Sequence, residues 1–171
     1  MNSFRRNTLF FTRLCILLML PALAAAEQEQ KDNAAVPVAT DLSQLAAQSS
    51  QRKVPILLMF SAKDCDYCER LEEDVIRPMM LSGDFDRRAI FRKVEIDGAQ
   101  LKDFKGGKLD AEAFAHERHI QVTPTLVFVD SRGEELAPKV IGYQTSGFYN
   151  AYLDQAIDVS QQTLRQRQSS R

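Results

Sequence analysis

The sequence lacks any strong excess of charge of one sign. Its 22 lysines and arginines nearly balance 23 aspartates and glutamates, which leaves a formal net charge of −1. There is no basic stripe and no run of like charge, so we expect no nucleic-acid partner. Internal repeats are also missing. With 171 residues, 44% of them hydrophobic and 26% charged, the composition is typical of one ordinary globular domain.

Cysteine is scarce, with only three residues, which excludes a framework of several disulfides. Cys15 lies in the N-terminal segment, so removal of that segment would leave only Cys65 and Cys68. A bridge between residues three apart closes so small a loop that it removes little entropy from the unfolded chain. The pair therefore indicates redox chemistry or metal binding rather than stabilisation.

The first 26 residues differ in character from the rest. Arginines precede a short apolar stretch over 14–26 that ends in small residues, the pattern of a secretory signal peptide. The alternative is an uncleaved membrane anchor, but so short a helix spans only about 20 Å of a hydrocarbon core roughly 30 Å thick. We therefore expect cleavage after Ala24 or Ala26. Export to the periplasm of a Gram-negative bacterium, or to an equivalent oxidising space, would follow.

Hydrophobic patterns predict alternating helices and strands. Helices are expected from Asp41 to about 51, from the cysteines to Pro78, after Asp110, and from Ser146 to 158; strands are expected at 54–60, 89–97, 126–129 and 136–141, with a loop over 98–109. The last helix should bury one face, made of Phe148, Tyr152, Leu153, Ala156 and Ile157.

This order predicts an α/β fold with one mixed sheet and helices on both of its faces. Helical crossovers predict parallel strands, and the closing hairpin predicts an antiparallel pair. The domain should span 41–158. It should follow a flexible lead-in over 27–40 and precede a frayed polar tail over 159–171.

Cys65 and Cys68 fall where the first strand meets the following helix. The thiolate is the nucleophile in disulfide exchange, and the partial positive charge of a helix N-terminus lowers the pKa of a thiol placed there. Cys65 is therefore expected to attack. Cys68, one turn further along, is expected to resolve the mixed disulfide.

These features together resemble the thioredoxin superfamily over about residues 41–158. The match includes the Cys-x-x-Cys at a strand–helix junction, the segment 122–125 (Val-Thr-Pro-Thr) before a strand, and Gly142 after the last strand. The stretches Phe60 to Cys65, Val127 to Asp130 and Ile141 to Tyr143 look most like small periplasmic thioredoxin-like proteins, such as those associated with sulphur oxidation.

The resemblance implies a thioredoxin fold and thiol–disulfide exchange with disulfide-containing proteins, without a cofactor. It implies a cis Thr123–Pro124 bond whose backbone faces the sulfurs and pairs with an extended substrate segment. Thr123, Pro124 and Gly142 are thus candidate substrate-binding residues. Tyr67 is another, because its place between the cysteines forces it near the surface. Tyr143 and Phe148 could also line that surface, although we expect Phe148 in the core.

Three positions depart from ordinary thioredoxins. Asp64 replaces the tryptophan before Cys65, and no proline lies between the cysteines. Met59 stands six residues before Cys65, where the family has a buried acid that assists the resolving cysteine. Proton transfer at Cys68 should therefore use water or another group. Lys93 aligns with a lysine that neighbours this acid, but an exposed strand lysine is the favoured interpretation.

Acidic residues crowd the start of the cysteine helix, and Asp64 and Asp66 flank Cys65. Negative charge near a thiol disfavours its thiolate, whereas strong oxidants depend on a stabilised reduced form. We therefore expect the two aspartates to tune the pair towards a reductase or an isomerase-like protein. The alternative is that these carboxylates only favour the helix N-terminus and lie in solvent. A reductase in an oxidising space needs a thiol donor, expected in the membrane, and we expect a monomer.

Two other functions stay open. His116 and His119 could join the two cysteines in a zinc or copper site, although the spacing from Cys68 is far longer than in zinc fingers. Copper held by the two thiolates alone, as in a metallochaperone, is favoured over that arrangement. The third hypothesis is a redox-inactive binding module, which would have no need of an intact cysteine pair.

Overall fold

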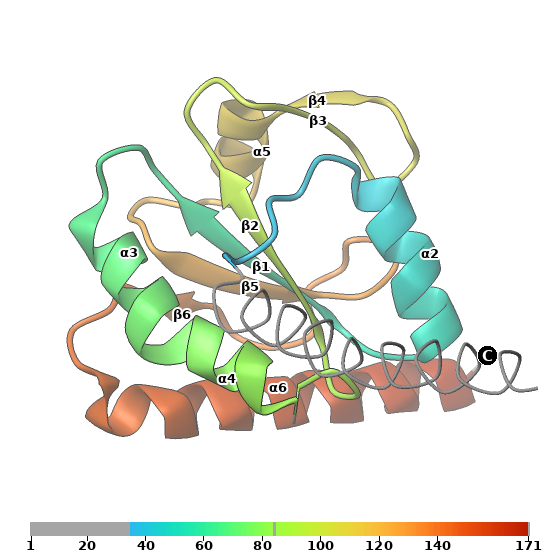
Figure 1. Cartoon of the computed structure of the whole chain (residues 1–171). Helices are drawn as coiled ribbons and strands as arrows, with labels where there is room; N and C mark the ends of the chain where they lie inside the picture. The colour runs from blue at the N-terminus through green and yellow to red at the C-terminus, as the bar shows by residue number, and fades with distance from the viewer. Residues whose placement is uncertain (1–34, 84, 171) are drawn as a thin grey trace, which may run out of the picture. The chain divides into compact units, whose positions relative to one another are not determined.

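The computed structural model describes residues 35–83 and 85–170, drawn in colour in Figure 1. The expected signal peptide and most of the expected lead-in lie outside the described residues. Within the described ranges, every helix is too short or too polar to cross a bilayer.

A mixed four-stranded sheet forms the centre of the domain, in the order β2-β1-β5-β6 (Figure 1). Strand β1 (Ile56–Ser61) pairs in parallel with β2 (Ile90–Glu95) and antiparallel with β5 (Thr125–Val129). Strand β6 (Val140–Ile141) then pairs antiparallel with β5 and is shorter than expected. The predicted α/β class and mixed sheet are confirmed.

The direction of β5 differs from the expectation that a helical crossover leaves the strands parallel. Thr125, the first residue of β5, lies opposite Phe60 near the end of β1. The intervening helix α5 (Ala111–Glu117) has only seven residues, so it rises about 10 Å, roughly half the length of a six-residue strand. The chain therefore re-enters the sheet at the same end at which it left β2, and β5 runs antiparallel to β1.

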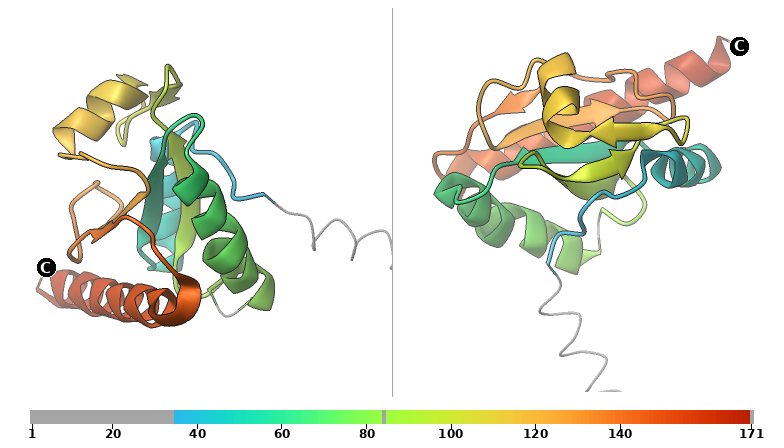
Figure 2. Two further views of the ribbon diagram at one scale, coloured as in Figure 1. Left: turned by 90° about the vertical axis from the view of Figure 1, so that its left-hand side faces the viewer. Right: turned by 90° about the horizontal axis from the view of Figure 1, so that it is seen from above.

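Helices cover both faces of the sheet, as predicted (Figure 2). Successive side chains of β1 point to opposite faces. Leu57 and Met59 belong to the core beneath the cysteine helix and the C-terminal helix. The other core gathers Ile56, Leu58, Phe60 and apolar residues of α5 and α2 (Leu42–Arg52).

The helix after the cysteines continues past Pro78, where the sequence predicted an end or a kink. It comprises α3 (Asp66–Leu71), one π-helical turn η1 (Glu72–Ile76) and α4 (Arg77–Ser82). The amide of Arg77 bonds to the carbonyl of Glu72, five residues back. Proline normally clashes with the carbonyl one turn earlier, and the wider π turn gives its ring room.

Two segments expected to be irregular contain regular pairing. Within the expected loop, β3 (Gln100–Lys102) and β4 (Lys108–Asp110) form a small hairpin before α5. The described end of the expected lead-in lies along β2, where the Ala39 amide donates to the Lys93 carbonyl at 2.7 Å. Residues 35–40 therefore cover the outer edge of β2 and are part of the domain.

The C-terminal helix α6 runs from Ser146 to Ser169, so the tail expected to be frayed is helical to that point. Its buried stripe contains Tyr149, Leu153, Ile157, Ser160 and Leu164. The predicted inner face mixed two adjacent stripes of the helix. Phe148 and Tyr152 belong to the second stripe, and their side chains are 77% and 63% exposed. The longer helix packs along the first stripe only.

Candidate active site

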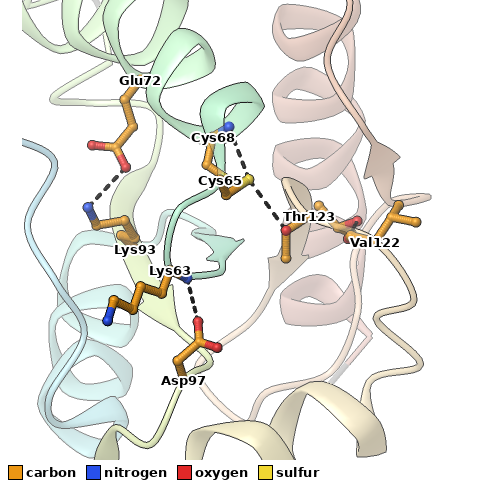
Figure 3. Close-up of a disulfide and its surroundings, with 9 residues drawn as sticks. Lys63, Cys65, Cys68, Glu72, Lys93, Asp97, Val122 and Thr123 are labelled. Carbon is orange, nitrogen blue, oxygen red and sulfur yellow. Dashed lines mark hydrogen bonds and ion pairs between the residues drawn. A yellow bond between two sulfur atoms is a disulfide. The ribbon is translucent and has the colours of Figure 1, made fainter.

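The two cysteines form a disulfide where β1 passes into α3 (Figure 3). Cys65 is the N-cap of α3, and its Sγ accepts a hydrogen bond from the Cys68 amide at 3.3 Å. The Cys65 sulfur therefore lies at the helix end that presents unpaired N–H groups. Cys68 is only 1% exposed, whereas Cys65 is partly exposed. An incoming sulfur can reach Cys65 and not Cys68.

The loop before β5 lies against the disulfide from the other side. The Thr123–Pro124 bond is cis, as the family resemblance implied. The Thr123 hydroxyl is 3.5 Å from the Cys65 Sγ, and the Gly142 amide donates to the Pro124 carbonyl at 2.8 Å. The loop before β5 therefore contacts the Cys65 sulfur through Thr123 and is held in turn by Gly142.

One side of the disulfide opens into a pocket of about 440 Å³, here named the charged pocket. It is lined by the two cysteines and by mostly ionisable side chains: Ser61, Ala62, Lys63, Asp64, Glu69, Glu72, Lys93, Glu95 and Asp97. Lys93 and Glu95 come from β2 and Asp97 from the loop after it. The Lys63 amide donates to the Asp97 carboxylate (Figure 3).

A half-buried ion pair lies in this pocket. The Lys93 ammonium is 3.0 Å from the Glu72 carboxylate, and the two side chains are only 18% and 14% exposed. Lys93 is thus not the exposed strand lysine that the sequence favoured. Its register explains the difference, because Lys93 pairs directly with Met59 and points to the same face of the sheet, which α3 covers.

Glu72 is the functional candidate that the sequence analysis did not single out. Met59 is 1% exposed and belongs to the core, so no carboxylate occupies the position where the family has its buried acid. Glu72 follows Cys68 by four residues, and its amide bonds to the Cys68 carbonyl. That spacing puts both side chains on one face of the helix. The Cys68–Glu72 spacing, read with Lys93, was the signal available in the sequence.

The two aspartates expected to tune the cysteines are both exposed. Asp64 lines the charged pocket and has a left-handed backbone (φ 54°), which directs the chain into the Cys65 cap. Asp66 is the first residue of α3 and does not line that pocket. The structure brings only Asp64 into the same cavity as the cysteines.

A groove of about 570 Å³, here named the aromatic groove, lies beyond Thr123 on the opposite side of the disulfide and is not lined by either cysteine. None of its lining residues carries a charge: Tyr67, Val122, Thr123, Val140, Ile141, Gly142, Tyr143, Gln144, Thr145, Phe148, Tyr149 and Tyr152. All the sequence-predicted substrate contacts except Pro124 are among them. Phe148, expected in the core, is instead one of its exposed walls.

Two buried tyrosines form the floor of the aromatic groove. Tyr143 and Tyr149 are 4% and 8% exposed, and their rings pack edge-to-face with centroids 5.2 Å apart. The Tyr143 hydroxyl donates to the Asp74 carboxylate at 2.8 Å, which ties the groove to the cysteine helix. Burial, and to a lesser degree the neighbouring Tyr143, raise the pKa of Tyr149.

The histidines proposed as metal ligands do not join the cysteines. His116 lies in α5 and His119 follows it, and both are exposed. In the described part of the chain, no three or more histidine, cysteine, aspartate or glutamate side chains are grouped so that they could hold a metal ion. The described residues therefore give no support to a Cys₂His₂ site.

Comparison with known proteins agrees with this architecture. The family model described as thioredoxin-like domain matches residues 42–157. A search of curated proteins gives no match.

Solved structures share the fold at low sequence identity. The DsbH oxidoreductase superposes with a TM-score of 0.55 at 17% identity, covering 73% of this chain and 87% of its own. A thioredoxin from Thermus thermophilus gives a TM-score of 0.53 at 18% identity, covering 71% of this chain and 87% of its own. At these identities the likeness concerns the fold alone.

Proposed function

The chain belongs to the thioredoxin-like family, and from this membership we propose that it exchanges disulfides with protein substrates through Cys65 and Cys68. One observation carries the proposal: a disulfide at the N-terminus of α3 whose outer sulfur is partly exposed beside Thr123. A redox-inactive binding module needs no such pair. A structural role is also poorly served, because the bridge closes a loop of very few residues.

In the reductive direction the Cys65 thiolate attacks one sulfur of a substrate disulfide. A Cys65–substrate bond forms, and the other substrate sulfur leaves with the electron pair of the broken bond. The Cys68 thiolate then attacks the Cys65 sulfur, which releases the second substrate sulfur as a thiolate. The substrate gains two electrons, and the protein ends with the Cys65–Cys68 disulfide. A thiol donor must reduce this disulfide before the next cycle.

We assign the proton transfer at Cys68 to Glu72. The buried Cys68 thiol must lose its proton before it can attack, and a buried thiol needs a nearby acceptor. Glu72 lies one helical turn away in the same pocket, and Lys93 orients its carboxylate at 3.0 Å. Water in the charged pocket then exchanges the proton with solvent.

Export and electron flow are further parts of the proposal. The apolar stretch over 14–26 supports secretion, and a secreted reductase would draw on a membrane-embedded thiol donor. The reduction potential of the cysteine pair tests the direction, measured by equilibration with glutathione buffers and thiol alkylation. A value near about −230 mV or lower supports a reductant, whereas a value between roughly −180 and −120 mV would place the protein with isomerases and oxidants.

Two substitutions test the proposed activity and the order of attack. Cys65→Ser should abolish reduction of 5,5′-dithiobis(2-nitrobenzoate) and of insulin. Cys68→Ser should react once and retain the substrate as a mixed disulfide, visible by mass spectrometry. Turnover that survives Cys65→Ser would refute the assignment. Stoichiometric copper on protein purified without chelator, with no disulfide reduction, would favour the metallochaperone hypothesis instead.

A further inference from the structure

The exposed apolar side chains of this domain are concentrated beside the disulfide. Seven large hydrophobic side chains are exposed in the described part of the chain. Five of them line the aromatic groove: Tyr67, Val122, Ile141, Phe148 and Tyr152. Single exposed apolar residues need no explanation, but a contiguous patch of them marks an interaction site.

Helix α6 contributes Phe148 and Tyr152 to this patch, although both are distant from the cysteines in the sequence. Phe148 and Tyr152 are one turn apart, so they lie side by side on the helix. They are 77% and 63% exposed, whereas Tyr149 and Leu153 of the adjacent stripe hold α6 to the sheet. Folding therefore does not require the two exposed rings. Their free energy of burial remains available to a partner.

We propose that the aromatic groove is a specificity subsite that binds a large apolar side chain near the disulfide-bonded cysteine of an extended substrate segment. This inference rests on the proposed function, because the substrate cysteine must be bonded to Cys65. Thr123 connects the groove to the sulfur, because it lines the groove and its hydroxyl lies 3.5 Å from the Cys65 Sγ. A volume of about 570 Å³ is in the range of ligand pockets.

The chemistry of the lining specifies the occupant. The described part of the chain places no charged side chain in the groove lining, so a charged segment would lose hydration there without gaining an ion pair. The charged pocket on the other side of the disulfide offers the reverse environment. A segment bonded to Cys65 should therefore turn its apolar flank towards α6.

One polar atom is buried beneath the groove floor. Tyr149 is 8% exposed, and its hydroxyl has no hydrogen-bond partner among residues 35–83 and 85–170. Buried hydroxyls are normally paired. Because this hydroxyl is enclosed beneath the groove floor, it offers no contact to a bound segment, and the subsite is defined by its apolar walls.

The test measures the first step of exchange alone. The reduced Cys68→Ser protein is mixed with short peptides whose single cysteine carries a thionitrobenzoate group. Cys65 attacks the peptide sulfur, and thionitrobenzoate leaves as a coloured thiolate with the electron pair of the broken bond. Paired peptides differ in one residue, phenylalanine or serine, placed one to three positions before or after the cysteine.

We expect at least one phenylalanine position to raise the second-order rate roughly tenfold over its serine counterpart. In a Phe148→Ser/Tyr152→Ser variant this ratio should fall close to one. The matched control is Val159→Ser, because Val159 is an exposed apolar residue of the same helix outside the groove. It should keep the tenfold ratio. Urea unfolding midpoints check that each variant is folded.

The other outcomes separate the two proposals. The subsite is refuted and the redox function stands if the wild type reduces 5,5′-dithiobis(2-nitrobenzoate) but the Cys68→Ser protein shows no peptide preference. The same holds if the preference survives when Phe148→Ser and Tyr152→Ser are added to the Cys68→Ser protein. A wild-type dimer that becomes monomeric in the double variant would make the groove a self-association surface, which also overturns the subsite. If Cys65 reacts with no disulfide, the proposed function itself fails.

Discussion

The two sides of one disulfide differ in almost every physical respect. The charged pocket holds a half-buried ion pair between Glu72 and Lys93, whereas none of the described residues that line the aromatic groove is charged. The buried Cys68 lines only the charged pocket, whereas the partly exposed Cys65 lies between that pocket and Thr123 of the groove. The comparison indicates that proton chemistry and substrate selection are assigned to separate surfaces.

Different elements build the two surfaces, so they can be changed independently. The charged pocket is formed by α3 and the start of η1, by the ends of β1 and β2, and by the chain that follows each strand. The aromatic groove is formed mainly by the loop before β5, by β6 and by the start of α6. A substitution on α6 should therefore alter substrate choice without altering the step at Cys68, and a substitution in the charged pocket should do the reverse.

The largest effect is expected from Glu72→Gln. Loss of the proton acceptor should slow the release of substrate by Cys68 roughly a hundredfold, the lower end of what general acid–base groups contribute. The attack by Cys65 should change far less. Acid quench and chromatography of a single turnover would show the Cys65–peptide mixed disulfide accumulating in the variant and not in the wild type.

Glu95→Gln is the matched control for Glu72→Gln. Glu95 is the other carboxylate near Lys93, at 3.6 Å, but its side chain is 53% exposed and comes from β2 rather than from the cysteine helix. Glu95→Gln removes the same charge from the same pocket. It should change the rate of the resolving step by no more than about twofold, as surface substitutions usually do. Glu72→Asp should recover part of the lost rate. Equal slowing in both glutamine variants would mean that charge alone matters.

The second prediction contrasts the two stripes of α6. Leu153→Ala should lower the free energy of unfolding by about 2 to 5 kcal/mol, because Leu153 is fully buried in the core. Phe148→Ala should change it by no more than about 0.5 kcal/mol, because that ring is mostly in solvent. Urea denaturation measures both. A large loss on Phe148→Ala would mean that the groove wall is structural, and would weaken the case for a binding surface.

Much of the fold could be predicted from local patterns. Asp41 and Asp110 cap α2 and α5 through their side chains, as expected, and the apolar run at β1 is buried on both faces. The predictions that failed were those that depended on tertiary packing. The prediction that Phe148 and Tyr152 are buried was wrong, because hydrophobic periodicity defines neighbouring stripes of a helix but not which stripe meets the sheet. The predicted parallel direction of β5 was wrong because the short α5 does not return the chain to the opposite end of the strands.

The features of the candidate site also divide into those that local patterns predict and those that tertiary packing determines. The position of Cys65 at a helix start and the cis Thr123–Pro124 bond agree with the motif and the family resemblance. The Glu72–Lys93 pair could not be assigned beforehand, because it depends on the register that places Lys93 opposite Met59. Strand register joins residues that are distant in the sequence, and neither alternation nor spacing within one element determines it.

The smallest expected effect concerns the only polar atom buried at the groove floor that lacks a partner among the described residues, the Tyr149 hydroxyl. Every ionic group of the charged pocket that is mostly buried is paired, so this atom sharpens the contrast between the two sides. Tyr149→Phe should leave the free energy of unfolding unchanged or raise it by about 1 kcal/mol, because removal of an unsatisfied buried hydroxyl removes a desolvation cost. Urea denaturation at pH 7 measures this, with the exposed Tyr152→Phe as control.

The pH dependence of the same variant gives an independent check. Burial raises the pKa of Tyr149 above the value of about 10 that a tyrosine has in the unfolded chain. The folded protein therefore holds this proton at pH values where the unfolded chain has lost it, and the wild type should lose stability as the pH rises above about 10. Tyr149→Phe lacks this contribution, so its advantage over the wild type should grow between pH 7 and pH 10.5. A destabilised Tyr149→Phe protein at pH 7 would show that the hydroxyl is hydrogen-bonded in the folded protein, for example to buried water.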